Sequence, residues 1–252
     1  MTEMKVTFRQ RRLENDQSGY LTWKIDERLA NLATGETALV LCDVWDKHWC
    51  RGAEERLAKL LPQMIKVVRA ARARGILVVH APSETMDFYK DSPARQRLLQ
   101  VAPIEPPPDF PHPETPLPIN DSDGGGDTDN NPAGVDVAVW TRQHPAIKID
   151  HDRDVISDRG DELFSYYRQR GIKNILIMGV HTNMCILQRT FAIKQMVKWG
   201  FTVALIRDLT DTMYNPARPP YVEHAEGTRL VVEYIEKFWC PTILSDEILT
   251  PD

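Results

Sequence analysis

Long hydrophobic runs are missing from this sequence, and their absence excludes a protein anchored by a membrane-spanning helix. No apolar stretch approaches the roughly 20 residues that such a helix requires. The stretch Met1–Tyr20 is polar and charged, without the apolar core of a signal peptide. We therefore expect a cytoplasmic protein with no membrane partner.

Paired cysteines and an excess of positive charge are missing as well. The four cysteines, at 42, 50, 185 and 240, show no CxxC spacing, which argues against a disulfide framework and against a zinc site. The formal net charge of −5 does not suit a protein that follows nucleic-acid phosphates. We expect a reducing compartment, no nucleic-acid partner and no cofactor.

What the sequence does have is a regular alternation of short apolar runs and helical patterns. The runs are short and mostly apolar on both faces, which is typical of parallel strands buried between helices. Strands are expected at residues 37–42, 76–79, 135–140, 146–149, 174–179, 201–206 and 242–244, and the main helices at 53–74, 161–170, 183–199 and 221–237. This alternation predicts an α/β fold with a doubly wound, mostly parallel sheet of about six strands between two helix layers.

Two segments differ from this pattern. Residues 1–35 form an N-terminal arm in which 6–8 and 20–23 are expected to pair as a short hairpin, and residues 36–252 form one domain. Residues 102–134 carry eight prolines between 103 and 118, followed by a glycine-rich acidic run. A long insert of this kind is usually a lid or an interface loop. The acidic run is not expected to bind calcium, because Pro132 stands where the calcium loop needs a glutamate.

Cys185 stands where a predicted strand turns sharply into a helix. Free amides at a helix N-terminus favour the thiolate, and a thiolate attacks carbonyl carbon. The alternative is a buried structural cysteine. Asp43 ends the strand 37–42, at the same carboxyl edge of a parallel sheet where active sites gather. It is a candidate proton acceptor for the thiol, or else a cap or turn residue.

Four further residues are candidates for the same cleft. Lys148 lies between two isoleucines, where a lysine either extends toward solvent or stabilises negative charge inside a cleft. Trp45 and His48 follow Asp43, and His80 ends the strand 76–79; these side chains either line a substrate pocket or pack in the interior. No helical or strand spacing groups the histidines, so no metal site is predicted.

The order of these residues resembles a known group of enzymes. Asp43 after an apolar strand, Lys148 after the long insert, and Gly-Val-His-Thr-Asn-Met-Cys ending at 185 resemble the isochorismatase-like cysteine hydrolase superfamily. The resemblance covers roughly residues 36–244. It implies a three-layer sandwich and an Asp43-Lys148-Cys185 triad that hydrolyses a small amide-like substrate through a thioester.

The resemblance also implies details of the turn before Cys185. A non-proline cis peptide is expected between Val180 and His181, with His181 also near the substrate. The amide of Cys185 and that of His181 or Met184 would hold the substrate oxyanion. Two alternatives remain on the same scaffold: an isochorismatase-type ether hydrolase, which does not need the cysteine, and a non-catalytic ligand-binding protein. A homo-oligomer is expected, with the arm and the insert as contacts.

Overall fold

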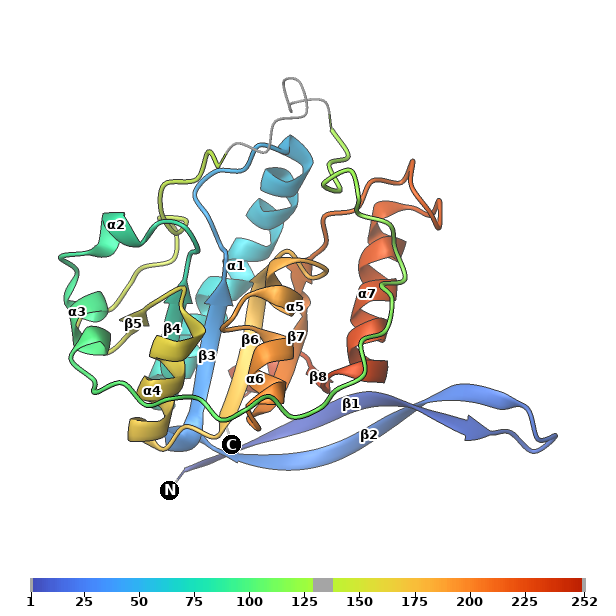
Figure 1. The fold of residues 1–252 in the computed structure, drawn as a ribbon, viewed down its shortest axis with the longest axis horizontal. Helices are drawn as coiled ribbons and strands as arrows, with labels where there is room; N and C mark the ends of the chain where they lie inside the picture. The colour runs from blue at the N-terminus through green and yellow to red at the C-terminus, as the bar shows by residue number, and fades with distance from the viewer. Residues whose placement is uncertain (1, 129–137, 251–252) are drawn as a thin grey trace.

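The computed structural model describes residues 2–128 and 138–250, and within them the strands form one sheet (Figure 1). Its order is β2-β1-β8-β7-β6-β3-β4-β5. The strands are β1 Glu3–Asn15, β2 Leu21–Ala33, β3 Thr37–Cys42, β4 Leu77–Ala81, β5 Val155–Ile156, β6 Asn174–Val180, β7 Thr202–Asp211 and β8 Thr242–Ile243. The six strands from β8 to β5 are parallel. The predicted parallel sheet is therefore confirmed, and the arm extends it by two antiparallel strands.

Helices cover both faces of the parallel strands (Figure 1). The helices are α1 Arg51–Ala73, α2 Met86–Tyr89, α3 Pro93–Leu99, α4 Gly160–Arg170, α5 Cys185–Gln188, α6 Ile193–Lys198, α7 His224–Phe238 and α8 Asp246–Leu249, with a 3-10 turn η1 at Thr34–Glu36. Alternate side chains of β3 point to opposite layers: Val40 packs with α4, α6 and α7, whereas Leu39 and Leu41 pack with α1 and α8. In the described part of the chain, no helix is both long and apolar enough to cross a membrane.

The two strands of the N-terminal arm are much longer than the segments 6–8 and 20–23 that the sequence indicated. Its two strands each have 13 residues and pair throughout, from Glu3 opposite Ala33 to Asn15 opposite Leu21. Polar and charged residues dominate these strands, so the apolar alternation that marks a strand is weak there. Ion pairs hold the part of the arm near the body in place: Arg11 contacts Glu233 and Glu236 of α7.

Two other expectations about the elements were wrong. The segment 146–149 is not a strand; the partner of β4 is Val155–Ile156, which the Asp154 carboxylate anchors by accepting hydrogen bonds from the Asp150 amide and from His80. The single helix expected at 183–199 is instead two short helices, α5 and α6, separated at Arg189 to Ala192. Of the strand expected at 135–140, residues 135–137 lie outside the described residues.

The described part of the insert, residues 102–128, crosses the outer surface of the helix layer that contains α6 and α7 (Figure 1). The Tyr234 hydroxyl donates to the Thr115 carbonyl over 2.8 Å, and the His112 ring stacks on Trp239 with centroids 3.9 Å apart. Further along, Asp121 accepts a hydrogen bond from Asn183 beside Cys185. The insert thus runs from the helix layer to the edge of the sheet that carries Cys185. Its last residues, 129–134, lie outside the described part.

Candidate functional site

The carboxyl ends of β3 and β6 come together because of Gly179. This residue has φ +131°, and a Cβ atom on it would lie 2.0 Å from the Cys42 carbonyl oxygen. Only glycine permits that approach. It brings Asp43, which follows β3, next to the turn that leads from β6 into α5. The peptide bond between Val180 and His181 in this turn is cis, as the resemblance implied.

Side chains of the turn bind it to the end of β7 and the residues beyond it. The Asn183 side chain accepts the Met213 amide over 2.9 Å and donates to the Met213 carbonyl over 3.0 Å. The Thr182 and Thr210 hydroxyls are 2.7 Å apart. Thr182 and Asn183 are fully or almost fully buried. These contacts fix the backbone that presents Cys185.

Asp43 is fully buried and holds three partners. One carboxylate oxygen accepts the Ser83 amide over 2.7 Å, and the other accepts Arg189 Nε over 3.1 Å. The Cys185 thiol lies within side-chain hydrogen-bonding range of the same carboxyl. Burial raises the pKa of Asp43, and the Arg189 charge and the Ser83 hydrogen bonds only partly offset that effect. The backbone at Asp43 is left-handed, with φ 50°, which is strained for a non-glycine residue.

The surroundings of Cys185 favour the thiol over the thiolate. Burial raises its pKa well above the ordinary range, and the nearby Asp43 charge raises it further. The Arg189 charge and the His181 amide act in the opposite direction but do not compensate. α5, which begins at Cys185, has only four residues and a small dipole, so the expected stabilisation of the thiolate by this helix N-terminus is weak.

Lys148 is not beside Asp43. Its side chain is exposed and lines a different surface depression together with Arg69 and Arg72.

The cation at Asp43 is Arg189, which sequence analysis missed. A signal for it was present, because Arg189 follows Cys185 by four positions, one helical turn, and so projects from the same side. Its remaining hydrogen bond goes to the exposed Glu84 over 3.2 Å.

A cavity of about 250 Å³ adjoins Asp43 on the α1 side of the sheet. Trp45, His48, His144 and His181 line it, so three of the predicted pocket residues gather there. Burial lowers the pKa of His48 to about 4 and that of His181 well below its ordinary value. Both imidazoles are neutral at pH 7, with ring centroids 4.9 Å apart.

Aromatic rings form one wall of this cavity. Trp45 stacks on Trp140 with centroids 4.1 Å apart and planes tilted by 11°, and Trp45 Nε1 donates to the Ser83 carbonyl. His48 Nδ1 accepts the Cys50 amide over 3.0 Å, so the proton of the neutral ring is on Nε2. Among the described residues, no group of three or more His, Cys, Asp or Glu side chains is arranged to hold a metal ion.

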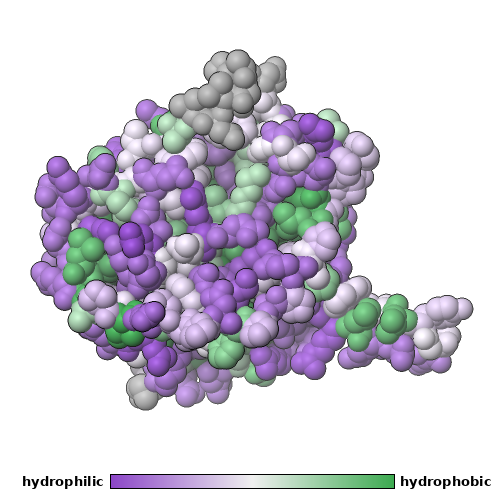
Figure 2. Space-filling model, in the orientation of Figure 1, coloured by the Kyte–Doolittle hydropathy of each residue, from purple (hydrophilic) through white to green (hydrophobic). Residues whose placement is uncertain are grey.

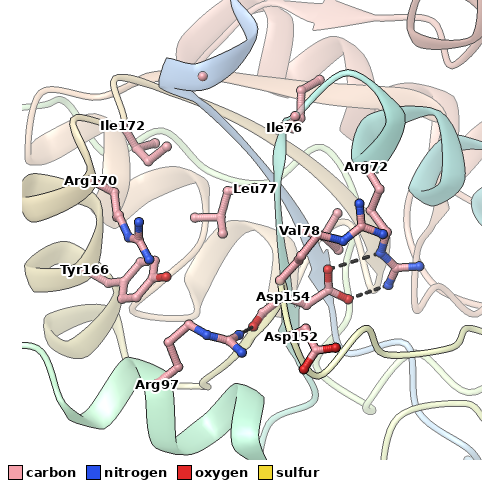
Figure 3. A pocket seen from close by; sticks show the side chains of 13 residues that line it. Arg72, Ile76, Leu77, Val78, Arg97, Asp152, Asp154, Tyr166, Arg170 and Ile172 are labelled. Atoms are coloured by element: carbon pink, nitrogen blue, oxygen red, sulfur yellow. Dashed lines mark hydrogen bonds and ion pairs between the residues drawn. The ribbon is translucent and has the colours of Figure 1, made fainter.

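His80 does not reach this cavity, contrary to expectation. It is fully buried, 2.6 Å from the Gln143 side chain and 2.9 Å from the Asp154 carboxylate. Asp154 also forms an ion pair with Arg72 of α1 (Figure 3). Burial alone would raise the pKa of Asp154, but hydrogen bonds from His80 and Arg72 lower it to about 2. His80 is therefore part of a structural ion-pair network.

That network borders a second cavity, of about 390 Å³, at the amino ends of the strands (Figure 3). Several arginines surround it, but they have partners within the protein. Arg97 donates to the carbonyls of His151 and Asp154, and the Arg170 guanidinium lies 5.4 Å from the Tyr166 ring centroid. This cavity lies at the opposite edge of the sheet from Cys185.

Comparison with known proteins identifies the fold. No family model and no curated protein matches the sequence. Solved structures do match: a cysteine hydrolase from Pseudomonas syringae pv. phaseolicola is 16% identical with a TM-score of 0.52, covering 86% of this chain and 92% of its own. An isochorismatase from Pseudomonas putida is 11% identical with a TM-score of 0.50, covering 85% and 91%. The chain therefore has the isochorismatase-like fold.

Proposed function

We propose that this protein is a cysteine hydrolase that acts on a small amide-like substrate. The observation that carries the proposal is the buried Asp43 carboxyl, which contacts both the Cys185 thiol and the Arg189 guanidinium. A thiol becomes a nucleophile when a base within hydrogen-bonding range accepts its proton. Arg189 replaces Lys148 as the cation of the proposed triad.

In the acylation step, Asp43 takes the thiol proton and the Cys185 sulfur forms a bond to the carbonyl carbon. The C–N bond of the substrate then breaks, and the leaving nitrogen takes the proton from Asp43. A thioester on Cys185 remains. Water gives a proton to Asp43 as it attacks this thioester, the C–S bond breaks to release the acid product, and the proton passes from Asp43 to the Cys185 sulfur to restore the thiol. Arg189 stabilises the negative charge that alternates between Asp43 and Cys185.

The oxyanion of each tetrahedral intermediate needs amide donors. The Cys185 amide opens α5, where an amide has no acceptor within the helix. The His181 amide is a suitable second donor, because it faces the Cys185 sulfur. Met184 is less suitable than expected, because its amide already donates to the His181 carbonyl over 3.1 Å. We therefore assign the oxyanion to Cys185 and His181.

The cavity beside Asp43 supports a planar, uncharged or cationic substrate. Trp45 offers a flat stacking surface, and the neutral His48 and His181 add hydrogen-bonding groups without charge. The charged side chains on the lining are Asp43, Asp46, Lys47 and Glu54, so acidic groups outnumber basic ones there. An anionic substrate would be repelled at such a surface.

An ether hydrolase of the isochorismatase type is the second candidate. The raised pKa of Asp43 favours it, because a carboxyl that retains its proton can donate that proton to a vinyl ether. In that reaction Cys185 has no covalent role. A ligand-binding protein without catalysis would hydrolyse neither class of compound.

A substrate panel separates these possibilities. Small amides, N-carbamoyl compounds and vinyl ethers are incubated with the wild type, with Cys185→Ala, and with Cys240→Ala as a control at a buried cysteine of the core. We expect amide or carbamoyl hydrolysis that is lost only in Cys185→Ala. Vinyl ether cleavage that survives Cys185→Ala would instead support the second candidate.

A further inference from the structure

The N-terminal arm leaves the body of the protein as a two-stranded ribbon. Its base is part of the core, where Met4, Val6 and Phe8 are buried beside α1 and α8. Its outer half, around the turn at 16–20, projects beyond α7 (Figure 1). The last contact of this half with the body is Trp23, which packs against Phe238 with ring centroids 5.6 Å apart. An isolated two-stranded ribbon is only marginally stable in water.

The turn gives the ribbon a defined shape. The Asp16 amide and carbonyl bond to the Tyr20 carbonyl and the Gly19 amide, and the Asp16 carboxylate accepts the amides of Ser18 and Tyr20. Gly19 has φ +86°, which suits glycine. The ribbon is therefore a formed element that projects into solvent.

One face of β2 carries a row of exposed hydrophobic side chains. Leu21, Ile25 and Leu29 lie four residues apart on the same face and are 68%, 53% and 82% exposed. Leu13 of β1, opposite Trp23 on this face, is 48% exposed. Figure 2 shows hydrophobic side chains on the projecting part of the molecule. A row of this kind on a projecting strand marks an interaction surface.

The outer edge of β2 is also unpaired. β2 is the terminal strand of the sheet, and among the described residues no strand lies beyond it. Its outward amides and carbonyls form a template for another strand. The exposed row and the open edge belong to the same strand, so one partner strand would cover both.

We propose that this partner is β2 of a second copy of the chain, paired antiparallel about a two-fold axis at Ile25. Residues directly opposite each other in an antiparallel pair lie on the same face of the sheet. A two-fold axis between the two copies of β2 therefore requires that one residue lies opposite its own copy. With Ile25 at the centre, Leu21 faces Leu29 of the other copy. On the opposite face, Lys24 faces Asp26 of the other copy, which gives two ion pairs by symmetry.

The neighbouring registers are disfavoured by charge. A centre at Lys24, Asp26, Glu27 or Arg28 would place each of these charged residues against its own copy, and like charges directly opposite are destabilising. Ile25 is the one residue between 24 and 28 that can face itself without repulsion. Lys24 and Asp26 now make only exposed contacts within the ribbon, to Glu14 and Arg12, which contribute little.

Sedimentation velocity over a wide range of concentrations tests the proposal. The wild type should sediment as a dimer of the 28.9 kDa chain. Ile25→Lys should sediment as a monomer, whereas Gln17→Lys, the same kind of added charge in the turn, should remain dimeric. Circular dichroism confirms that each variant is folded.

A charge exchange tests the register itself. Lys24→Asp alone and Asp26→Lys alone should each be monomeric, because like charges then face each other across the axis. An equimolar mixture of the two variants should form a heterodimer, because each pair then joins opposite charges. A monomeric wild type, a dimer that survives Ile25→Lys, or a mixture that stays monomeric would overturn the proposal.

Discussion

At the scale of single residues, Arg189 is the side chain on which the proposed chemistry depends most after Cys185 and Asp43. Among the described residues it is the only cation that contacts Asp43, and although burial opposes this, the Asp43 charge raises the pKa of Arg189. Sequence order pointed to Lys148 because a lysine at that distance matched the resemblance. Which basic side chain reaches a buried carboxylate depends on packing, which spacing alone does not encode.

Replacing Arg189 should therefore impair catalysis where replacing Lys148 does not. We expect Arg189→Gln to lower kcat/KM by about 10²–10³, the loss typical for removing one group that stabilises developing charge. Lys148→Gln is the matched control, because it removes one cation from an exposed position. Steady-state kinetics on a hydrolysed member of the substrate panel measures both. If kcat/KM fell equally in Arg189→Gln and Lys148→Gln, the proposed role of Arg189 at Asp43 would be contradicted.

The pH dependence of the reaction follows from Asp43. The carboxyl must be ionised to accept the thiol proton, so activity is lost as pH falls through the pKa of Asp43. Burial raises that pKa above its usual value of 3.8, so the acidic limb of kcat/KM should lie at higher pH than for an ordinary aspartate. Arg189 lowers the same pKa, and Arg189→Gln should shift the limb further up. If Arg189→Gln left the acidic limb of the kcat/KM profile at the same pH, a group other than Asp43 would be the one that titrates.

At the scale of elements, buried apolar segments were predictable and polar or short ones were not. The segments β3, β4 and β6 and the first half of β7 are nearly continuous apolar runs, because both of their faces lie under helices. β5 has only two residues, too few for a sequence pattern. The arm strands are held by cross-strand pairs and by ion pairs to α7, and such contacts between distant segments leave no local signal.

The close approach of β3 and β6 at Gly179 gives a prediction for these elements. We expect Gly179→Ala to destabilise the fold by about 3 kcal/mol or more, because the left-handed backbone and the clash with Cys42 both cost free energy. Gly171→Ala, at the left-handed C-cap of α4, meets nothing within 4 Å and should cost only about 1–2 kcal/mol. Denaturant unfolding measures both. A Gly179→Ala variant as stable as Gly171→Ala would contradict the packing described.

At the scale of the whole molecule, one buried ion-pair network joins α1, β4 and the chain before β5. Asp154 connects Arg72 of α1 to His80 of β4 and, through His80, to Gln143. Gln143 in turn forms a β-bridge with Trp45 at the cavity. Sequence analysis placed His80 at the right edge of the sheet but not its partner, because Asp154 follows it by 74 residues.

This network should make stability depend on pH in acid. The folded pKa of Asp154 is about 2, below its usual 3.8, so the carboxylate stabilises the fold above pH 4 and this contribution is lost toward pH 2. The contribution corresponds to roughly 2 kcal/mol. Asp154→Asn should be less stable than the wild type by about 3 kcal/mol at pH 7, with the difference shrinking as pH falls. Asp152→Asn, at an exposed aspartate nearby, serves as the control in unfolding measurements, and a difference independent of pH would contradict this account.

The central claim is that Cys185 forms a covalent acyl intermediate with help from Asp43. Rapid-quench mass spectrometry tests it most directly, with p-nitrophenyl acetate and a hydrolysed amide of the panel as probes. We predict one acyl group on the wild type, mapped to the peptide that contains Cys185. In Asp43→Asn it should form at least about 10² times more slowly, because its general base is missing. Turnover without any adduct, or an adduct that persists in Cys185→Ala, would contradict the account.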